Sequence, residues 1–365
     1  MAIFDPGEPL ASAFTRAVGG ALDVFFDGQE AQSVGTQPDL VAMARAFTAG
    51  GKRLRPAFCV WGYLAAASEP EDAGWLVQVA ASLDLLHVSA LVHDDVMDGS
   101  ATRRGLPAAH VQLAAWHRAN GGHGDPEAFG RAGAILLGNL LAGWSAELYD
   151  TAGAPEEALG RGRPVLARMR TEVNTGQFLD ALAQARSPLD ARRDPAAMLA
   201  LTHRVIDDKT TKYTIVRPLQ LGAALAGAAS EILDGLAAFG SPLGLAFQLR
   251  DDLLGVFGDE AVTGKPAGDD LREGKLTALI VHAMEDTSDA DAARLATLLG
   301  TPTLTPADID EARAIIAACG AQAAVEADIE AARDEALATL ATLPIRPEAR
   351  QALTALTHLA TSRSS

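Results

Sequence analysis

Apolar residues recur at helical intervals along most of this chain. One such stretch runs from Trp75 to Val96, with spaced apolar residues at Val77, Ala80, Leu83, Leu86, Ala90 and Leu91. The same period runs through residues 189–206 and 309–343. Aromatic residues make up only 5% of the chain and runs of alternating Val, Ile and Thr are scarce, so propensity favours helix nearly throughout. The sequence therefore predicts an all-α bundle of about ten or more long helices.

Glycine and proline mark the expected turns between these helices. They cluster at Gly50-Gly51, residues 121–126, Ser187-Pro188, residues 264–266 and residues 300–302. Thr305-Pro306 has the form of an N-cap followed by proline at the first helical position. We find no Pro/Gly/Ser-rich linker and no sustained run of charge, so residues 1–365 are predicted to form a single domain.

Charge and cysteine content restrict the classes of function. The formal net charge of −17 argues against a nucleic-acid partner. An anionic substrate would require a local concentration of Lys and Arg together with divalent cations. Cys59 and Cys319 are too few for a disulfide framework, which indicates a reducing compartment. The uncharged stretch Ala132–Ala146 is shorter than the ~20 residues of a spanning helix. We therefore expect a cytoplasmic protein without a transmembrane segment.

A group of carboxylates closes one long apolar helix. Asp94 and Asp98 are four positions apart, so they lie on one helical face, with Asp95 beside them. Such carboxylates repel one another unless a cation is present, and Mg²⁺ suits them because it keeps waters and bridges to substrate phosphates. Alone, the pattern also fits a solvated acidic helix end. Arg103 and Arg104 follow, where guanidinium groups can grip diphosphate oxygens, and they favour a binding site.

These residues resemble the first aspartate-rich motif, with its trailing Arg-Arg-Gly, of the trans-polyprenyl diphosphate synthases. A second segment, 247–255, resembles the second motif of that family, usually FQxxDDxxD, through Gln248, Asp251 and Asp252. Gly255 stands where the family has the last aspartate. The segment 50–56 matches the family's GGKRxRP. The resemblance covers about residues 40–285 with its motifs in the expected order.

The resemblance implies an isoprenoid-synthase helical bundle with a central cavity, and a role for each matching residue. The implied catalytic residues are Asp94, Asp95, Asp98, Arg103, Lys209, Asp251 and Asp252. The implied substrate-binding residues are Gly51, Lys52, Arg55, His87, Arg103, Arg104, Lys209, Thr210, Gln177, Gln248, Lys265 and Lys275. The implied ligands of Mg²⁺, three ions per active site with diphosphate bound, are Asp94, Asp98, Asp251 and Asp252. A homodimer is carried over from the family in the same way.

The implied reaction joins isopentenyl diphosphate to an allylic diphosphate by ionisation, condensation and loss of a proton. Product length depends on the depth of an apolar tunnel below Asp94. Ser89 and Ala90 stand where short-chain members of the family commonly place aromatic rings, with Leu86 beyond them. We therefore expect a product longer than farnesyl diphosphate, with geranylgeranyl diphosphate favoured and longer polyprenyl diphosphates as the alternative.

Two other functions compete with this interpretation. A class I terpene cyclase shares the first motif, the metals and the fold, but its second metal motif combines Asn, Ser or Thr, and Glu. It also does not need the 50–56 segment. A non-catalytic partner subunit is suggested only by Gly255, and such subunits usually lose the first motif, which is intact here. A catalytic synthase is the best reading.

Overall fold

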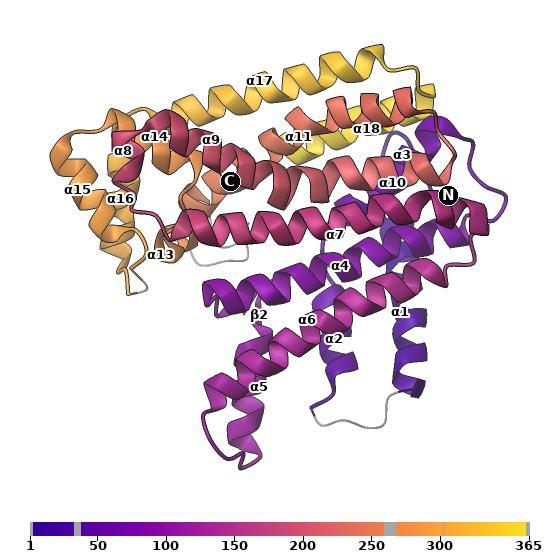
Figure 1. Cartoon of the computed structure of the whole chain (residues 1–365), viewed down its shortest axis with the longest axis horizontal. Helices are drawn as coiled ribbons and strands as arrows, with labels where there is room; N and C mark the ends of the chain where they lie inside the picture. The colour runs from indigo at the N-terminus through magenta and orange to yellow at the C-terminus, as the bar shows by residue number, and fades with distance from the viewer. Residues whose placement is uncertain (1–2, 33–37, 259–267, 302, 363–365) are drawn as a thin grey trace. The chain divides into compact units, whose positions relative to one another are not determined.

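The computed structural model describes residues 3–32, 38–258, 268–301 and 303–362 (Figure 1). The chain forms two compact units. Unit 1 consists of Met1–Arg163, Leu221–Ala228 and Arg346–Ala352, and unit 2 consists of Pro164–Gln220, Ala229–Ile345 and Leu353–Ser365. The expectation of a single domain over residues 1–365 stays a prediction.

Helices make up nearly all of the regular structure, as the sequence predicts. The elements that begin in unit 1 are α1 (Ser12–Gln32), α2 (Leu40–Thr48), α3 (Leu54–Ala66), α4 (Gly74–Asp98), β1 (Thr102–Arg103), β2 (Leu106–Pro107), α5 (Ala109–Ala119), α6 (Pro126–Asp150), α7 (Glu156–Gln184) and α18 (Pro347–Thr361). The elements that begin in unit 2 are α8 (Asp190–Arg193), α9 (Pro195–Val205), the π-helix η1 (Ile206–Val216), α10 (Arg217–Leu225), α11 (Ser230–Phe257), α13 (Asp269–Glu273), α14 (Ala278–Asp286), α15 (Asp289–Leu298), α16 (Pro306–Ala318) and α17 (Ala321–Thr342).

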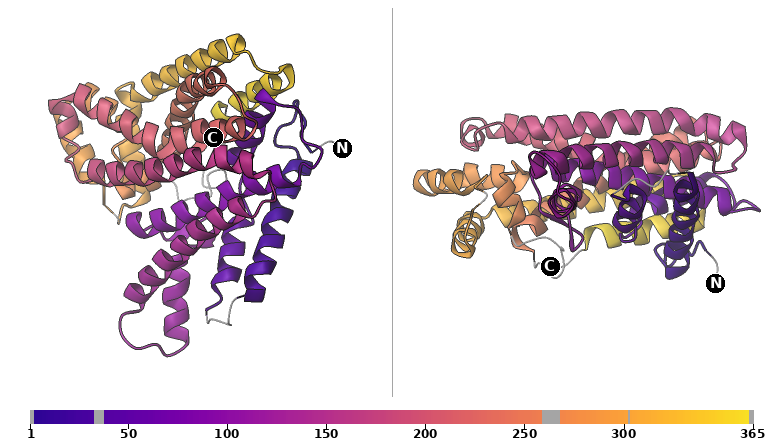
Figure 2. Two further views of the ribbon diagram at one scale, coloured as in Figure 1. Left: turned by 45° about the vertical axis from the view of Figure 1, so that its right-hand side comes forward. Right: turned by 90° about the horizontal axis from the view of Figure 1, so that it is seen from below.

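Helix α4 forms the core of unit 1 and packs along α6, which also packs on α5 (Figure 2). The apolar residues of α4 are buried on nearly all sides of the helix, including Leu76, Leu83 and Leu85 at 0% exposure. A helix that is apolar all round belongs in an interior. It ends at Gly99, whose φ of 69° gives the left-handed C-cap that favours glycine. The carboxylates of the last turn are thereby placed at the end of a fixed core helix.

Helix α11 has the corresponding position in unit 2. It packs along α17 and η1, and Leu236, Phe239 and Leu243 are fully buried. The segments α9, η1 and α10 follow one another without a break as a single helical run. Its middle part is π-helical, a wider and rarer form that occurs frequently at functional sites.

Most helix positions expected from the sequence are confirmed, but two apolar runs are divided. Helix α4 contains the whole Trp75–Val96 stretch, and Thr305 caps α16 through a capping box with Asp308. The run over 189–206 is interrupted at Asp194, which caps α9. The run over 309–343 is interrupted at Gly320, where φ is 85°. A periodic apolar pattern continues through such breaks because the helices on both sides bury the same kind of face.

Two helices, α4 and α11, have the length and hydropathy of membrane-spanning segments. In α4, 78% of the most apolar window is buried inside the structure, compared with 39% in α11. Core helices of globular proteins pass the same test, so these two helices are weak evidence for a membrane span.

Candidate active site

The last turn of α4 carries the first aspartate motif. Asp95 is buried at 1% exposure, and it accepts hydrogen bonds from Nε of Arg103 at 2.8 Å and from Nη2 at 2.5 Å. The same guanidinium lies 3.7 Å from Oδ2 of Asp94. Asp94 and Asp98 keep part of their surface exposed. Asp95 therefore holds Arg103 in place. Asp94 and Asp98 lie on one helical face, where both carboxylates can bind the same cation.

Arg104 points to a different place from Arg103. A short hairpin pairs Arg103 with Leu106, and its turn holds Arg104 at a φ of 53° and Gly105 at 75°. Such two-residue turns match the twist of a hairpin. Nη1 of Arg104 donates to the carbonyls of Phe47 and Gly50, at 3.0 Å each. Arg103 thus contacts the aspartate motif, whereas Arg104 contacts the 50–55 loop.

Glycine is required at position 51 of that loop. Its φ is 109°, and a Cβ atom there would lie 3.0 Å from Nη2 of Arg104. Lys52 is exposed, whereas Arg55 is partly buried. The 50–55 loop carries Lys52 and Arg55, and the guanidinium of Arg104 lies against it; we call these three residues the basic group. Its role in binding an anion stays a prediction.

A buried ion pair anchors the same loop. Arg53 has a φ of 55° and is 8% exposed. Its Nη1 donates to Oδ2 of Asp84 at 2.5 Å, and its Nη2 donates to the carbonyl of Thr48 at 2.8 Å. Asp84, on α4, is 5% exposed and belongs to none of the motifs quoted from the sequence. The sequence offered one sign of this pair: Asp84 is a single acidic residue inside a continuous apolar helix. A buried charge of that kind is retained only when it has a partner.

His87 lies one turn after Asp84 and is partly buried. Burial of the ring, followed by the nearby charges of Arg55, Arg104, Arg103 and Arg53, holds the pKa of His87 well below its usual value. The imidazole is therefore neutral at physiological pH, and it can contact a diphosphate through a hydrogen bond without carrying charge.

This depressed pKa predicts a pH effect on stability. Below about pH 6.5 the unfolded chain binds a proton at His87 that the folded chain does not bind, so stability falls as the pH falls through that range. We expect a His87→Gln variant to lose less stability than the wild type between about pH 7.5 and pH 5.5. Urea unfolding at both pH values measures this difference, and equal losses in the two proteins would contradict the assignment.

The three residues expected to set chain length lie along α4. Leu86 and Ser89 are buried, at 5% and 4% exposure, and Ala90 is partly buried. The hydroxyl of Ser89 donates to the carbonyl of Gly138 in α6 at 2.8 Å. A Cβ atom at Gly138 would lie 2.4 Å from the ring of His93, so α4 and α6 need glycine there to approach closely. The helix beside this part of α4, which the sequence did not identify, is α6.

In unit 2, a chain of hydrogen bonds connects three residues expected in the site. The hydroxyl of Thr210, on η1, donates to Oε1 of Gln248 on α11 at 2.7 Å. Nε2 of Gln248 donates to Oδ1 of Asp252 at 2.7 Å. The side-chain amide of Gln248 is thereby fixed in orientation, and it connects the Lys209-Thr210 pair to the second aspartate motif.

Lys209 is positioned by Asp180 of α7. The two side chains form an ion pair with Nζ 2.6 Å from Oδ2. Gly176 lies one turn earlier, and a Cβ atom there would lie only 2.3 Å from the backbone nitrogen of Lys209. Because Gly176 has no side chain, α7 and η1 can pack in direct contact there. The next residue, Gln177, is partly buried. Asp180 was not found from the sequence, where it is one acidic residue in a mixed helix.

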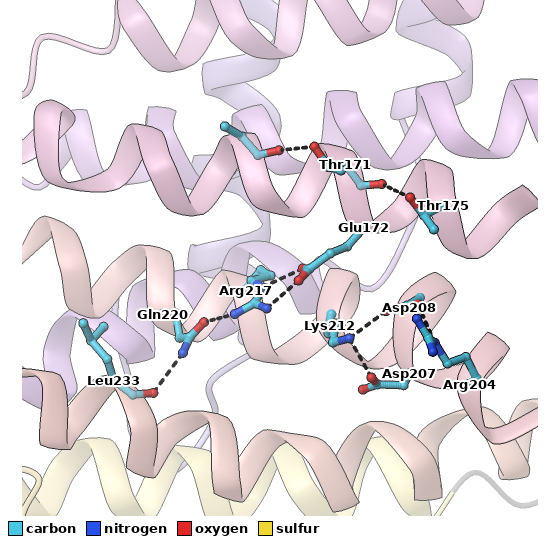
Figure 3. A network of polar contacts seen from close by, with 11 residues as sticks. Thr171, Glu172, Thr175, Arg204, Asp207, Asp208, Lys212, Arg217, Gln220 and Leu233 are labelled. Atoms are coloured by element: carbon cyan, nitrogen blue, oxygen red, sulfur yellow. Dashed lines mark hydrogen bonds and ion pairs between the residues drawn. The ribbon is translucent and has the colours of Figure 1, made fainter. Parts of the chain in front are cut away.

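A polar network holds the π-helical segment and its surroundings in place (Figure 3). Arg217 binds both carboxylate oxygens of Glu172, at 2.7 Å and 2.6 Å, and also contacts Gln220, which donates to the carbonyl of Leu233. The ammonium of Lys212 lies between Asp207 at 2.7 Å and Asp208 at 2.6 Å (Figure 3). These contacts fix both ends of the segment that presents Lys209 and Thr210.

The second aspartate motif has one exposed and one buried carboxylate. Asp251 is exposed on α11, whereas Asp252 is 6% exposed. Burial, together with the carboxylates of Asp270 and Asp251, raises the pKa of Asp252 to about 8, against the lowering effect of the Gln248 hydrogen bond. Desolvation and repulsion of this kind disfavour the charged form, and a bound cation would offset both.

Of the two late lysines, Lys275 lies in the described part of the chain. Lys275 lies 2.6 Å from Glu273 and 3.4 Å from Asp270. Lys265 lies outside the residues that the structure describes. Its implied role at the allylic diphosphate stays a prediction.

Both units carry carboxylates that suit a hard divalent cation. In the part of the chain that is described, no three His, Cys, Asp or Glu side chains form a complete metal cage. Mg²⁺ does not require one, because it is usually held by one or two carboxylates together with waters and substrate phosphates. Asp94 and Asp98 of unit 1, and Asp251 of unit 2, fit that donor set through their oxygen ligands and their exposure.

Known proteins match this chain along most of its length. Residues 37–316 match the family described as polyprenyl synthetase. The chain belongs to the polyprenyl synthetase family. This polyprenyl synthetase is 34% identical to a geranylgeranyl diphosphate synthase of Mycobacterium tuberculosis, over 82% of this chain and 80% of the relative. It is 29% identical to a nonaprenyl diphosphate synthase of the same organism, over 98% and 96% of the two chains.

A solved structure extends the similarity to the whole fold. It is that of a geranylgeranyl pyrophosphate synthase from Corynebacterium glutamicum, complexed with isoprenyl diphosphate and magnesium, which is 39% identical with a TM-score of 0.90. The alignment covers 99% of this chain and 100% of the other. The expected family, the all-α isoprenoid-synthase fold and prenyltransferase activity are confirmed. The roles of the individual site residues stay predictions.

Proposed function

We propose that this polyprenyl synthetase condenses isopentenyl diphosphate with allylic diphosphates in the presence of Mg²⁺, and that its main product is geranylgeranyl diphosphate. The observation that carries the proposal is the separation of Arg103 from Arg104. Arg103 is bound to the carboxylates of the first motif, and Arg104 joins the basic group of the 50–55 loop. One anion position thus lies beside potential metal ligands and the other does not. A condensing enzyme needs two diphosphate positions, whereas a terpene cyclase needs one.

Each group of residues has a defined task in the proposed reaction. We assign Asp94 and Asp98 in unit 1, and Asp251 and Asp252 in unit 2, as ligands of Mg²⁺, with three ions expected once diphosphate is bound. When bound, Mg²⁺ neutralises the allylic diphosphate as it leaves. Arg103, Lys209 and Lys275 bind the oxygens of that diphosphate as the allylic C–O bond breaks.

The second substrate completes the reaction. Lys52, Arg55 and Arg104 hold isopentenyl diphosphate, with neutral His87 as a further hydrogen-bonding group. The π electrons of its double bond form the new C–C bond to the allylic cation, and loss of a proton to the departed diphosphate restores a double bond. Positioning of the two substrates supplies much of the rate.

The test is incubation of the purified protein with Mg²⁺, isopentenyl diphosphate and, separately, dimethylallyl, geranyl and farnesyl diphosphates. The dephosphorylated products are then separated by chain length. We expect prenyl alcohols extended by whole isoprene units, ending at geranylgeraniol. Hydrocarbon products would instead indicate a cyclase. An absence of turnover with every primer would indicate a non-catalytic partner subunit.

The geranylgeranyl assignment rests on the small side chain of Ser89. We expect Ser89→Phe to shift the main product from geranylgeranyl to farnesyl diphosphate or shorter, because the ring would shorten the apolar tunnel that we assign below Asp94. Ser89→Ala is the matched control: it loses the bond to the Gly138 carbonyl but adds no volume, so product length should not change. If Ser89→Phe leaves the product unchanged, the tunnel does not pass this position. Main products longer than geranylgeranyl in the wild type would favour the polyprenyl alternative.

We also propose a homodimer that forms through one face of α6. Ile135, Leu136 and Leu140 are 44%, 59% and 38% exposed, and they follow one another at helical spacing. Ala132 and Gly143 continue this α6 stripe without charge. Contiguous exposed apolar surface of this kind marks an interaction site, and a second copy of the chain can bury it reciprocally.

Leu136→Arg is expected to convert the dimer to a monomer, because it places a charge in the middle of the α6 stripe. Sedimentation-velocity ultracentrifugation measures the change in mass. Leu359→Arg, which alters another exposed leucine at 50% exposure on α18, should leave the dimer intact. A dimer that survives Leu136→Arg would place the interface elsewhere.

We propose a cytoplasmic location for the enzyme. Its support is that Cys59 and Cys319 are both free thiols, Cys59 buried and Cys319 partly exposed. Cell fractionation with activity measured in the soluble and membrane fractions tests it, and activity confined to membranes would contradict it.

A further inference from the structure

Arg250 stands directly before the two carboxylates of the second aspartate motif, and its side chain contacts two other helices of unit 2. Nη1 and Nη2 donate to Oε1 and Oε2 of Glu326 on α17, at 2.6 Å each. Nε donates to the carbonyl of Thr361, in the last turn of α18, at 3.2 Å. All three nitrogens of the guanidinium group are thus engaged, two of them in the parallel pair of bonds that fixes its plane against a carboxylate. Arg250 is therefore held in one orientation by α17 and α18.

The partners of Arg250 are fixed in their own surroundings. Glu326 stands between Val325 and Ile329, which are buried in the hydrophobic core of unit 2, and α17 packs along α11. Thr361 is 4% exposed, and its hydroxyl donates to the carbonyl of Thr357 at 2.9 Å. The last turn of a helix usually frays unless it is tied down. Here the turn is buried, so both α17 and α18 offer Arg250 a rigid point of attachment.

A second contact holds α11 beyond the motif. Nε of Arg313, on α16, donates to the carbonyl of Val256 at 2.6 Å. The last four carbonyls of an α-helix have no partner within the helix, and a guanidinium group there also complements the negative end of the helix dipole. The two turns between Arg250 and Val256, which contain Asp251 and Asp252, are therefore attached to neighbouring helices at both ends.

Rotation of these turns about the helix axis would displace the carboxylates. Asp251 is exposed, whereas Asp252, the next residue, is buried. Side-chain ends lie about 5 Å from the axis of a helix, so a rotation of about 15° moves a carboxylate by more than about 1 Å. A displacement of about 1 Å in a reacting group can cost about 100-fold in rate. A contact that opposes this rotation consequently affects what Asp251 can bind.

We propose that Glu326 is a positioning residue for the second aspartate motif. Through Arg250 it fixes the rotation of the last turns of α11, and with it the direction in which Asp251 presents its carboxylate. The inference rests on the proposed function, because Asp251 is assigned there as a ligand of Mg²⁺. Glu326 itself belongs to none of the residues assigned to substrate or metal, and it acts through the guanidinium group that it binds.

Glu326→Gln keeps the size of the side chain and removes the charge from its pair with Arg250. We expect kcat to fall about 10-fold. Thermal unfolding is recorded in a series of Mg²⁺ concentrations at one fixed concentration of inorganic pyrophosphate, and the Mg²⁺ concentration giving half of the stabilisation should rise about 10-fold, the usual effect of losing a group that supports a metal site. The KM for isopentenyl diphosphate should change by less than about twofold, because that substrate is assigned to the basic group of unit 1.

Two further variants separate positioning from other roles. Glu330→Gln, which alters an exposed carboxylate one turn later on α17, is the matched control and should behave as the wild type. Arg250→Lys keeps a positive charge beside Asp251 but cannot form the parallel pair of bonds with Glu326. It should therefore lose as much as Glu326→Gln, and the double variant should lose no more than either single variant. Wild-type kinetics in Arg250→Lys would show that only the charge matters and would overturn the inference.

The outcomes also distinguish this inference from a structural role and from the proposed function. If Glu326→Gln lowers the unfolding temperature equally with and without Mg²⁺ and pyrophosphate, while kcat and the Mg²⁺ requirement stay unchanged, Glu326 is only structural and the inference is wrong. A wild-type protein that neither responds to Mg²⁺ with pyrophosphate nor extends allylic diphosphates would overturn the proposed function and this inference together. A wild-type protein that does both, with an unaltered Glu326→Gln variant, would overturn the inference alone.

Discussion

Replacement of Asp94 by asparagine is expected to lower kcat by about 10³-fold, equivalent to about 4 kcal/mol of transition-state stabilisation. Asp94 is partly exposed at the end of α4, whereas Asp95 is buried and holds Arg103. Asparagine keeps the shape but loses the charge that holds the metal. The KM for isopentenyl diphosphate should change little, since that substrate is assigned to the basic group around Lys52, Arg55 and Arg104.

Two measurements keep this result from being confused with misfolding. In the presence of EDTA, the Asp94→Asn protein should unfold close to the wild-type temperature, because the repulsion from Asp95 and Asp98 that is removed offsets the lost attraction to Arg103, 3.7 Å away. The stabilisation by Mg²⁺ with inorganic pyrophosphate should be lost. Glu71→Gln, a change at an exposed carboxylate before α4, is the control and should keep full activity. Retention of more than about a tenth of wild-type kcat by Asp94→Asn would contradict a role in metal binding.

The sequence predicted the helices and their motifs because both depend on local order. A period of apolar residues predicts α4, and spacing alone places Asp94 and Asp98 on one face. The capping box at Thr305 is also a local signal. What the sequence could not show is where a side chain turns once the chain is packed. Arg103 and Arg104 are adjacent, yet a left-handed backbone at Arg104 sends their guanidinium groups to different partners.

The residues missed by the sequence have partners far along the chain. Asp180 acts on Lys209, 29 positions later, and Asp84 acts on Arg53, 31 positions earlier. Asp180 stands in no recognisable pattern, and the one sign of Asp84 is its charge inside an apolar helix. A Cβ atom at Gly255 would lie 1.8 Å from Oδ2 of Asp270, a contact that no local pattern in the sequence indicates. Long-range pairs of this kind are products of tertiary packing, which local spacing does not encode.

The same reasoning makes Asp84 a charged residue of unit 1 whose loss should be strongly destabilising. We expect Asp84→Ala to lower the free energy of unfolding by about 3–5 kcal/mol, because Arg53 would remain buried without its carboxylate. The lost contact is short, at 2.5 Å, and the two side chains are each 7% exposed. Urea unfolding measures the change. Glu156→Ala, which breaks the exposed pair with Arg163, is the comparison and should have no measurable effect.

A double-mutant cycle shows whether the effect comes from the pair itself. Arg53→Met should be destabilising in the same range, whereas the double variant Arg53→Met/Asp84→Leu should lose much less than the sum, because neither charge is then left alone. Additive losses would mean that the two residues act separately.

We expect loss of the Arg53–Asp84 pair to weaken the binding of isopentenyl diphosphate as well. Arg53 keeps the 50–55 loop in its left-handed turn, and Asp84 also interacts with the charges of Arg55 and Arg104. Once Asp84 is removed, the basic group loses both its anchor and the negative charge that allows its guanidinium groups to stay close together. The KM for isopentenyl diphosphate should therefore rise about tenfold or more in Asp84→Asn, with the KM for the allylic substrate nearly unchanged. An equal rise in both would show a general loss of structure, and would remove Asp84 from the recognition of one diphosphate in particular.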